Sequence, residues 1–295
     1  MEAGPTKTWR SDTYASIDPS RPSLSLAGKT IAITGGGAGI GLAIALSCAK
    51  AGASQIALIG RRAHVLDQGK TEVAAIAPNA QVLCVQADVS IAKDIQNAFS
   101  TIQNAFGLVD ILINNAAYFS GASSILDVST EAWFSAFDVN VKGSLLTAKA
   151  FLAVASPNPA IANISTAVAH LPPVYFPGFS AYASSKIAAT QMFAYLQHER
   201  PDVHIVSIHP GRILTEMSAK VGRVAGKVDV IDTPELPADF TVWTLSEEAR
   251  FLKGKLIWAN WDVEELKAQK DVIEKSNLLT IAIEGWPFGE PVGRF

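Results

Sequence analysis

The chain has 295 residues, of which 49% are hydrophobic and 17% are charged. This composition supplies a large apolar core and excludes an intrinsically disordered chain. The net charge of −3 gives no basic excess, so neither a nucleic-acid partner nor an anionic membrane partner is expected.

Apolar strand-like runs alternate along the chain with longer amphipathic runs. Strands are predicted at residues 30–34, 54–59, 81–86, 109–114, 160–164, 203–209 and 256–258. Helices are predicted at residues 39–51, 63–77, 91–106, 130–154 and 180–198. Continuous apolar strands in this alternation predict an α/β fold with a Rossmann-like, doubly wound parallel sheet.

Three regions lie outside this alternation. Residues 1–25 form an N-terminal tail, and residues 263–295 form a C-terminal extension with a predicted helix at 263–275. The remaining residues, 26–262, are expected to make a single domain. Within it, residues 214–237 form a long irregular stretch, which indicates a lid or binding loop unless it merely connects two elements.

The chain carries no recognisable targeting or membrane segment. Residues 1–21 are polar and contain no apolar run of the signal-peptide kind. No window reaches the roughly 18 apolar residues that a membrane span needs. We therefore expect a cytoplasmic protein that does not span a membrane, while association of a tail with a lipid surface stays open.

A glycine cluster follows the first strand and opens the first helix. Glycines let the backbone approach a pyrophosphate, and the helix N-terminus supplies free N–H groups for it. The spacing T-G-x-x-x-G-I-G resembles the classical branch of the short-chain dehydrogenase/reductase family, and the resemblance covers roughly residues 26–262. It implies binding of NAD(P)(H) through the turn residues Gly35, Gly37, Gly39, Ile40 and Gly41.

The end of the second strand bears on the choice of cofactor. NAD-preferring members of the family usually place an acidic residue where this chain has Gly60, and Arg61 follows. A guanidinium binds a 2′-phosphate through two donors, so NADP(H) is preferred. NAD(H) stays an alternative because position 38 in the glycine turn is Ala, and Arg61 and Arg62 can also be solvated charges at a helix start.

Two further segments resemble the family's cofactor contacts. Asp88 and Val89 follow the third strand, where the family's acid binds the adenine amino group; Asp88 can also simply cap the next helix. Asn115 and Ala116 belong to an N-N-A-A segment after the fourth strand. This segment resembles N-N-A-G of the family, which fixes the sheet and lines the cofactor ribose.

Tyr182 and Lys186 form a Y-x-x-x-K pair on one face of a predicted helix. Reduction of a ketone puts negative charge on its oxygen, which needs a proton donor. A nearby ammonium lowers the pKa of a phenol. The resemblance therefore implies Tyr182 as acid or base and Lys186 as the charge that lowers its pKa and binds ribose. The alternative is a packed tyrosine and a surface lysine.

A hydroxyl partner for the substrate oxygen is expected after the fifth strand. The family uses the second serine of an S-S pair, which matches Thr166, and Ser165 stays an alternative. Asn140 matches a helical asparagine whose backbone carbonyl holds a water near the lysine; it can also be a polar residue satisfied inside its helix.

Pro210 and Gly211 begin a segment that resembles P-G-x-x-x-T of the family. The resemblance implies that Ile213 contacts the nicotinamide carboxamide and that Thr215 binds the carboxamide or the pyrophosphate. The alternative is an ordinary Pro-Gly turn. Four histidines, His64, His170, His198 and His204, show no metal-ligand spacing, so no metal is predicted. Both cysteines lie in apolar runs, which indicates reduced core thiols.

Apolar side chains gather where the pocket-forming loops are expected. They are Tyr118, Phe119, Pro172, Pro173, Val174, Tyr175, Phe176, Phe179, Met217 and Val221. They suit a hydrophobic ketone or secondary alcohol, although core packing or a subunit interface explains them equally. The tail containing Trp286 looks like that of fungal members associated with secondary metabolism, and a homo-oligomer, as a dimer or tetramer, is expected.

Three functions are compatible with these motifs. The first is an oxidoreductase, a carbonyl reductase or alcohol dehydrogenase that uses NADP(H) or, less favoured, NAD(H). The second is a dinucleotide-binding protein without catalysis. The third is an isomerase or dehydratase on the same fold. The pair of Tyr182 and Lys186 favours the first.

Overall fold

The computed structural model describes residues 4–219 and 232–282. Seven parallel strands form one sheet in the order β3-β2-β1-β4-β5-β6-β7. The order reverses beside β1, which gives the doubly wound topology that the alternating pattern predicts. The strands are β1 (Thr30–Thr34), β2 (Gln55–Gly60), β3 (Gln81–Gln86), β4 (Val109–Asn114), β5 (Ala155–Ile164), β6 (His204–His209) and β7 (Leu256–Trp258).

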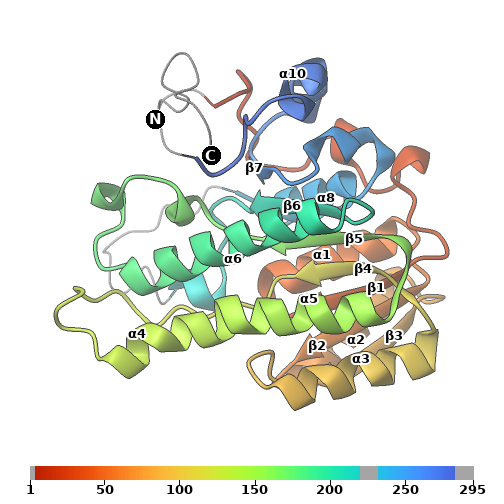
Figure 1. The fold of residues 1–295 in the computed structure, drawn as a ribbon. Coiled ribbons are helices and arrows are strands. Elements are labelled where there is room, and N and C mark those ends of the chain that lie inside the picture. The colour runs from red at the N-terminus through yellow and green to blue at the C-terminus, as the bar shows by residue number, and fades with distance from the viewer. Residues whose placement is uncertain (1–3, 220–231, 283–295) are drawn as a thin grey trace.

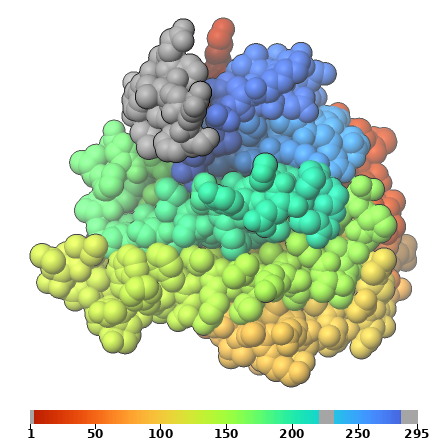
Figure 2. Space-filling view, viewed as in Figure 1, coloured from red at the N-terminus to blue at the C-terminus, as the bar shows by residue number. Residues whose placement is uncertain are grey.

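Helices cover both faces of this sheet (Figure 1). They are α1 (Gly39–Lys50), α2 (Ala63–Ile76), α3 (Ala92–Phe106), α4 (Thr130–Phe137), α5 (Ser144–Ala153), α6 (Ser180–Glu199), α8 (Glu235–Thr244), α9 (Val263–Ala268) and α10 (Lys270–Glu274). One apolar core lies between the sheet and α1, α2 and α8, and a second lies between the sheet and α3, α5 and α6. Figure 2 shows the outer surface of α3, α5 and α6 from the same side.

A ladder of polar side chains crosses the middle of the sheet. The side-chain amide of Asn114 donates to Asn163 and to Ser144, each at 3.0 Å, and the amide of Asn163 donates to Ser207 at 3.0 Å. Buried polar groups are costly unless they are paired, and these groups pair with one another. The ladder joins β4, β5 and β6 just below the ends that carry the predicted site residues.

Strand β5 begins at Ala155, five residues before the predicted start, and three helical regions also differ from the prediction. The helix predicted at 130–154 is interrupted by a π-helical turn, Asp138–Gly143, between α4 and α5. The helix predicted at 263–275 breaks at Gln269 into α9 and α10. Helix α8 was missed, and it begins inside the stretch 214–237 that was predicted to be irregular.

The N-terminal strap, residues 4–25, packs on the far end of the chain. Arg10 pairs with Asp262 at 2.7 Å, and Trp9 forms an isolated antiparallel bridge with Trp261. The backbone amide of Thr8 donates to Glu265 at 3.0 Å. The strap therefore lies against the end of the domain and the start of the C-terminal extension.

The C-terminal extension also covers the edge of the sheet. The amide of Leu256, in β7, donates to the carbonyl of Leu279 at 2.7 Å. This bond satisfies a group that an edge strand would otherwise expose. Trp286 lies outside the described residues. Across residues 4–219 and 232–282, no helix has both the length and the apolar character that a bilayer crossing requires.

Candidate active site

A cleft of about 480 Å³ runs along the carboxyl edge of the sheet. Its lining comes from segments that follow β1, β2, β3, β4 and β6, from the end of β5 and from the first turns of α6. Open parallel sheets bind ligands at this edge, beside the point where the strand order reverses. The cleft is therefore the candidate active site.

The glycine turn, residues 35–41, forms one wall of the cleft. Gly35 has a φ of +65°, which side chains other than that of glycine rarely adopt. A Cβ on Gly41 would lie 2.2 Å from the carbonyl oxygen of Gly35. Ala38, the N-cap of α1, gives the first-turn amides no side-chain acceptor. These amides and the helix dipole therefore suit a pyrophosphate.

The segment after β4 holds the glycine turn in place. The hydroxyl of Thr34 accepts hydrogen bonds from the backbone amides of Asn115 and Ala116, each at 3.0 Å. The side-chain amide of Asn115 donates to the carbonyl of Thr34 at 2.9 Å. Asn115 thus acts on the turn itself, as well as lining the cleft.

The far end of the cleft combines arginines with Asp88. A carboxylate oxygen of Asp88 accepts from the amide and hydroxyl of Ser90, at 2.9 and 2.7 Å. Burial raises the pKa of Asp88, but the Ser90 hydrogen bonds and the charge of Arg61, 3.8 Å away, outweigh it and lower the pKa. Asp88 therefore caps a turn and also lines the cleft. Arg61 is 70% exposed, and Arg62 pairs with Glu216 at 3.2 Å.

Tyr182 and Lys186 lie one turn apart on α6, and both line the cleft. The ammonium of Lys186 donates to the carbonyl of Ile164, at the end of β5, at 2.5 Å. Burial raises the pKa of Tyr182 to about 12 and lowers the pKa of Lys186 to about 8. The phenol pKa was expected to be lowered; here desolvation, which disfavours both charged forms, dominates.

Asn140 is fully buried in the π-helical turn. Its side chain accepts from the backbone amide of Tyr118 at 2.8 Å and donates to the backbone carbonyl of Tyr118 at 2.9 Å. It also donates to the hydroxyl of Ser185 at 2.9 Å. The backbone carbonyl of Asn140 accepts a hydrogen bond from the hydroxyl of Ser144 at 2.7 Å. Because π turns disturb the regular helical bonding and are frequent at functional sites, this position differs from an ordinary helix interior. Asn140 connects the segment after β4 to the residue that precedes Lys186.

The two candidate hydroxyls have different partners. The hydroxyls of Ser165 and Thr190 are 2.7 Å apart, and Thr190 donates its own proton to the carbonyl of Lys186. Ser165 is therefore the donor to Thr190. The hydroxyl of Thr166 accepts from the amide of Val168 at 3.3 Å, which leaves its proton free of that bond. Ser165 lines the cleft, whereas Thr166 is not among the lining residues.

The segment after β6 approaches the glycine turn. A Cβ on Gly39 would lie 3.4 Å from the Cγ2 of Thr215, so these two residues are neighbours. Gly211 has a φ of +89°, and the amide of Arg212 donates to the buried carboxylate of Asp232 at 2.7 Å. Pro210 and Thr215 line the cleft.

Only part of the apolar set predicted for the substrate reaches the cleft. Tyr118, Phe119 and Met217 line it. The ring of Phe119 meets that of Tyr182 edge-on, with centroids 5.6 Å apart, and packs on Phe179 at 4.9 Å. Val174 and Tyr175 are instead 79% and 65% exposed, and Val221 lies outside the described residues.

The cleft brings together most of the predicted site residues. They are Gly35, Gly37, Gly39, Ile40, Arg61, Asp88, Val89, Asn115, Ala116, Ser165, Tyr182, Lys186, Pro210 and Thr215. Five predicted residues lie beside it without lining it, namely Gly41, Asn140, Thr166, Gly211 and Ile213. Sequence reasoning missed the lining residues Val65, Leu66 and Val139, because ordinary apolar residues at helix positions carry no motif.

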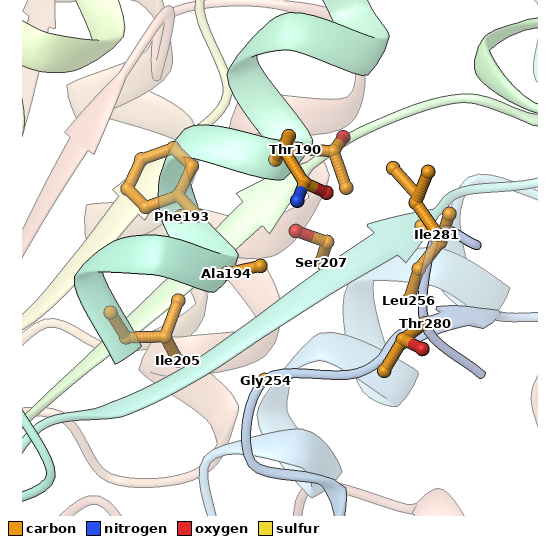
Figure 3. Close-up of a pocket in the computed structure, with 10 residues that line it drawn as sticks. Thr190, Phe193, Ala194, Ile205, Ser207, Gly254, Leu256, Thr280 and Ile281 are labelled. Carbon is orange, nitrogen blue, oxygen red and sulfur yellow. The ribbon is translucent and has the colours of Figure 1, made fainter. Parts of the chain in front are cut away.

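A second cavity, of about 80 Å³, lies between α6, β6 and residues 280–281 (Figure 3). It shares no lining residue with the cleft. Within residues 4–219 and 232–282, no three or more His, Cys, Asp or Glu side chains are grouped as metal ligands.

Comparison with known proteins gives consistent matches. A sequence model of a family described as short chain dehydrogenase matches residues 29–225. Short chain dehydrogenase pigC of Monascus ruber is 34% identical over 287 residues, which cover 94% of this chain and 92% of that protein. A short chain dehydrogenase/reductase of Claviceps purpurea (strain 20.1) is 34% identical over 271 residues, which cover 90% and 89%.

Solved structures match over most of the described fold. The crystal structure of a short chain dehydrogenase from Burkholderia cenocepacia J2315 in complex with NADP has a TM-score of 0.70 and 25% identity, and the match covers 81% of this chain and 99% of that one. Levodione reductase has a TM-score of 0.73 at 20% identity, covering 83% and 99%, which is a likeness of fold.

Proposed function

Because the chain belongs to the short-chain dehydrogenase family, we propose that it is an NADP(H)-dependent oxidoreductase that interconverts a hydrophobic ketone and a secondary alcohol. The observation that carries the proposal is that Tyr182 and Lys186 share one cleft with the glycine turn. A proton donor and a dinucleotide-binding turn in one cleft suit transfer of a hydride and a proton to the same substrate.

The residues of the cleft fit a nicotinamide dinucleotide. The glycine turn leaves no room for a side chain at Gly41, and the first-turn amides of α1 have no side-chain cap. These amides would hold the pyrophosphate, Asp88 and Val89 the adenine, and Asn115, Ala116 and Lys186 the ribose groups. The segment from Pro210 to Thr215, with Gly211 and Ile213, would hold the carboxamide end. The bound nicotinamide supplies or accepts the hydride.

Tyr182 is the proposed acid and base. A phenol with a pKa of about 12 keeps its proton at neutral pH, so it is ready to donate to a ketone oxygen. Its proton passes to that oxygen and leaves a phenolate. Lys186, with a pKa of about 8, is mostly protonated at pH 7, so its charge stabilises the phenolate. Oxidation of an alcohol uses the same groups in reverse.

We favour Thr166 as the partner for the substrate oxygen, although Ser165, its neighbour in the chain, is the one of the two that lines the cleft. Ser165 gives its proton to Thr190, whereas the hydroxyl of Thr166 accepts from Val168 and keeps its proton for a ligand. Asn140 bonds Ser185, the neighbour of Lys186, and so helps to position the lysine.

Two observations support NADP(H) over NAD(H). The end of β2 carries Gly60 instead of an acid, and the exposed side chain of Arg61 follows it at the cleft. A guanidinium there suits a 2′-phosphate, which an acid would repel. The similar Burkholderia cenocepacia structure has NADP bound.

The lining of the cleft supports an apolar substrate. Tyr118, Phe119 and Met217 present aromatic and thioether surfaces beside Tyr182. Such surfaces suit a hydrophobic, aromatic carbonyl compound. The relatives from Monascus and Claviceps are fungal, which fits a role in fungal secondary metabolism.

Turnover of NADPH with a panel of hydrophobic ketones tests the proposal. Tyr182→Phe should lower kcat by roughly 100-fold or more, because the proton donor is lost. Tyr195→Phe is the matched control: Tyr195 lies on the same helix, is 62% exposed, and its replacement should leave kcat unchanged. Binding of NADPH without turnover would favour the non-catalytic alternative. A product formed without net consumption of NADPH would favour an isomerase or dehydratase.

A further inference from the structure

His209 ends β6 and touches the turn that follows β5. We define the hydroxyl turn as residues 165–170, which include both candidate hydroxyls. The Nδ1 of His209 accepts a hydrogen bond from the amide of Ala167 at 3.1 Å. Because Nδ1 accepts, the ring proton of the neutral imidazole is on Nε2. Burial lowers the pKa of His209 to about 3, so the ring remains an acceptor at neutral pH.

A second contact holds the other end of the hydroxyl turn. The indole of Trp258, at the end of β7, donates to the Nε2 of His170 at 3.1 Å. The same indole meets the ring of His209 edge-on, with centroids 4.7 Å apart. The ends of β6 and β7 are therefore hydrogen-bonded to the hydroxyl turn at Ala167 and at His170. Figure 1 shows β5, β6 and β7 as neighbours in the sheet.

The bond at Ala167 acts directly on Thr166. The amide of Ala167 belongs to the peptide unit that carries the carbonyl of Thr166, so the imidazole fixes the plane of that peptide. The hydroxyl of Thr166 is fixed in turn by the amide of Val168. Loss of the bond at Ala167 would let the turn that begins there shift, and with it the Val168 amide that holds the hydroxyl of Thr166.

We propose that His209 is a positioning residue that orients the hydroxyl of Thr166 toward the substrate oxygen through its bond to Ala167. This role rests on the proposed oxidoreductase function. An apolar residue at the end of β6 would pack against Trp258 equally well, and it would avoid the cost of burying an imidazole. The acceptor atom is therefore what distinguishes histidine at this position.

The test compares His209→Asn with His209→Leu. The Oδ1 of Asn occupies the place of Nδ1 and accepts from Ala167, while Leu has a similar size and no acceptor. The readouts are kcat and KM for a hydrophobic ketone, the Kd for NADPH from quenching of tryptophan fluorescence, and hydrogen exchange at the amide of Ala167.

We expect His209→Leu to lower kcat by about 10-fold or more, because the amide of Ala167 loses its buried partner and the turn reorients. The Kd for NADPH should stay within about threefold, since the pyrophosphate end is untouched. His209→Asn should restore most of kcat. Exchange at Ala167 should be faster in the Leu variant alone.

Unchanged kcat in His209→Leu, or an equal loss in His209→Asn, would overturn the proposal. If the Leu variant does not fold, Ala167→Pro removes the donor instead; proline is tolerated at this first position of a helical turn, and kcat should fall similarly. Normal kcat in Ala167→Pro would also overturn it. Absence of turnover by the unmodified protein would refute the oxidoreductase function, and the exchange at Ala167 would still decide whether His209 holds the turn.

Discussion

Replacement of the buried Lys186 by Met should stabilise the protein in the absence of cofactor. Lys186 is 4% exposed, and burial lowers its pKa from 10.5 to about 8. At 1.36 kcal/mol per pKa unit, this difference corresponds to roughly 3 kcal/mol of lost stability at pH 7. Met keeps the apolar stem but loses the charged hydrogen bond to Ile164, which costs about 2 kcal/mol. The variant should therefore be about 1 kcal/mol more stable.

The sign of the pH dependence follows from the two protonation states of Lys186. The unfolded chain keeps the proton up to pH 10.5, while the folded chain loses it near pH 8. The unfolded state thus binds more protons between these values, so the stability of the unmodified protein rises with pH there. The difference in the free energy of unfolding between Lys186→Met and the unmodified protein should therefore become smaller as the pH rises. Tyr182, whose pKa is raised from 10.0 to about 12, has the opposite effect above pH 10.

Urea denaturation without added cofactor, at pH 7 and at about pH 9.5, measures this difference. Lys93→Met is the matched control, because Lys93 is exposed on α3 and its loss should change stability little. A Lys186→Met variant that is less stable than the unmodified protein at both pH values would refute the reasoning. So would a difference that does not change with pH.

Three further changes test the cleft and the strap. Gly41→Ala puts a Cβ 2.2 Å from the carbonyl of Gly35 and should weaken NADPH binding by about 10-fold or more in a fluorescence titration; an unchanged Kd would contradict the role of the turn. Arg61→Ala should raise the Kd for NADPH by about 10-fold and leave that for NADH unchanged by calorimetry; an equal loss for both would contradict the preference for NADP(H). Asp262→Ala removes the cap of α9 and the partner of Arg10, so the free energy of unfolding should fall by about 2 kcal/mol, and by less in Asp262→Asn. Burial raises the pKa of Asp262, but the bonds from Arg10 and the α9 amides outweigh it and lower the pKa, so this contribution should fade as the pH falls through that lowered value; a urea midpoint that Asp262→Ala leaves unchanged would contradict the strap's role.

Full burial left strand β1 predictable from the sequence but hid helix α8. Strand β1 is buried along its whole length and reads as a continuous apolar run, so its prediction is confirmed. Helix α8 was missed because every residue from Leu236 to Thr244 is buried. Burial on all sides leaves no alternation of apolar and polar residues with the period of a helix.

Contacts between distant parts of the chain explain the other differences. Arg10 and Asp262 are 252 positions apart, and no sequence motif around either residue predicts the ion pair. The polar composition of the strap therefore predicted a tail, although several of its polar groups bond to the domain and to the C-terminal extension. In the cleft, the bond between Ser165 and Thr190 was equally hidden, because it joins a strand end to the middle of a helix.

The direction of the pKa shifts was the least predictable property of the site. The spacing of Tyr182 and Lys186 predicts that both lie on one helix face, but the extent of their burial depends on packing from other elements. Phe119, which follows β4, packs against the Tyr182 ring in a T-shaped arrangement. Desolvation of this kind is set by the tertiary structure and opposes the effect expected from the ammonium alone.

Folding alone does not explain the choice of side chains at this edge of the sheet. Burial shifts the pKa values of Tyr182, Lys186 and His209 toward their neutral forms, and for Lys186 the shift means a loss of stability at neutral pH. An apolar residue in place of Lys186 would avoid that loss. A lysine buried at a cost in stability is best explained by chemistry: Lys186 and Tyr182 line the cleft with the glycine turn, and His209 ends β6 beside the hydroxyl turn. This arrangement fits the roles proposed for Tyr182 as proton donor, Lys186 as its supporting charge and Thr166 as a positioned hydroxyl.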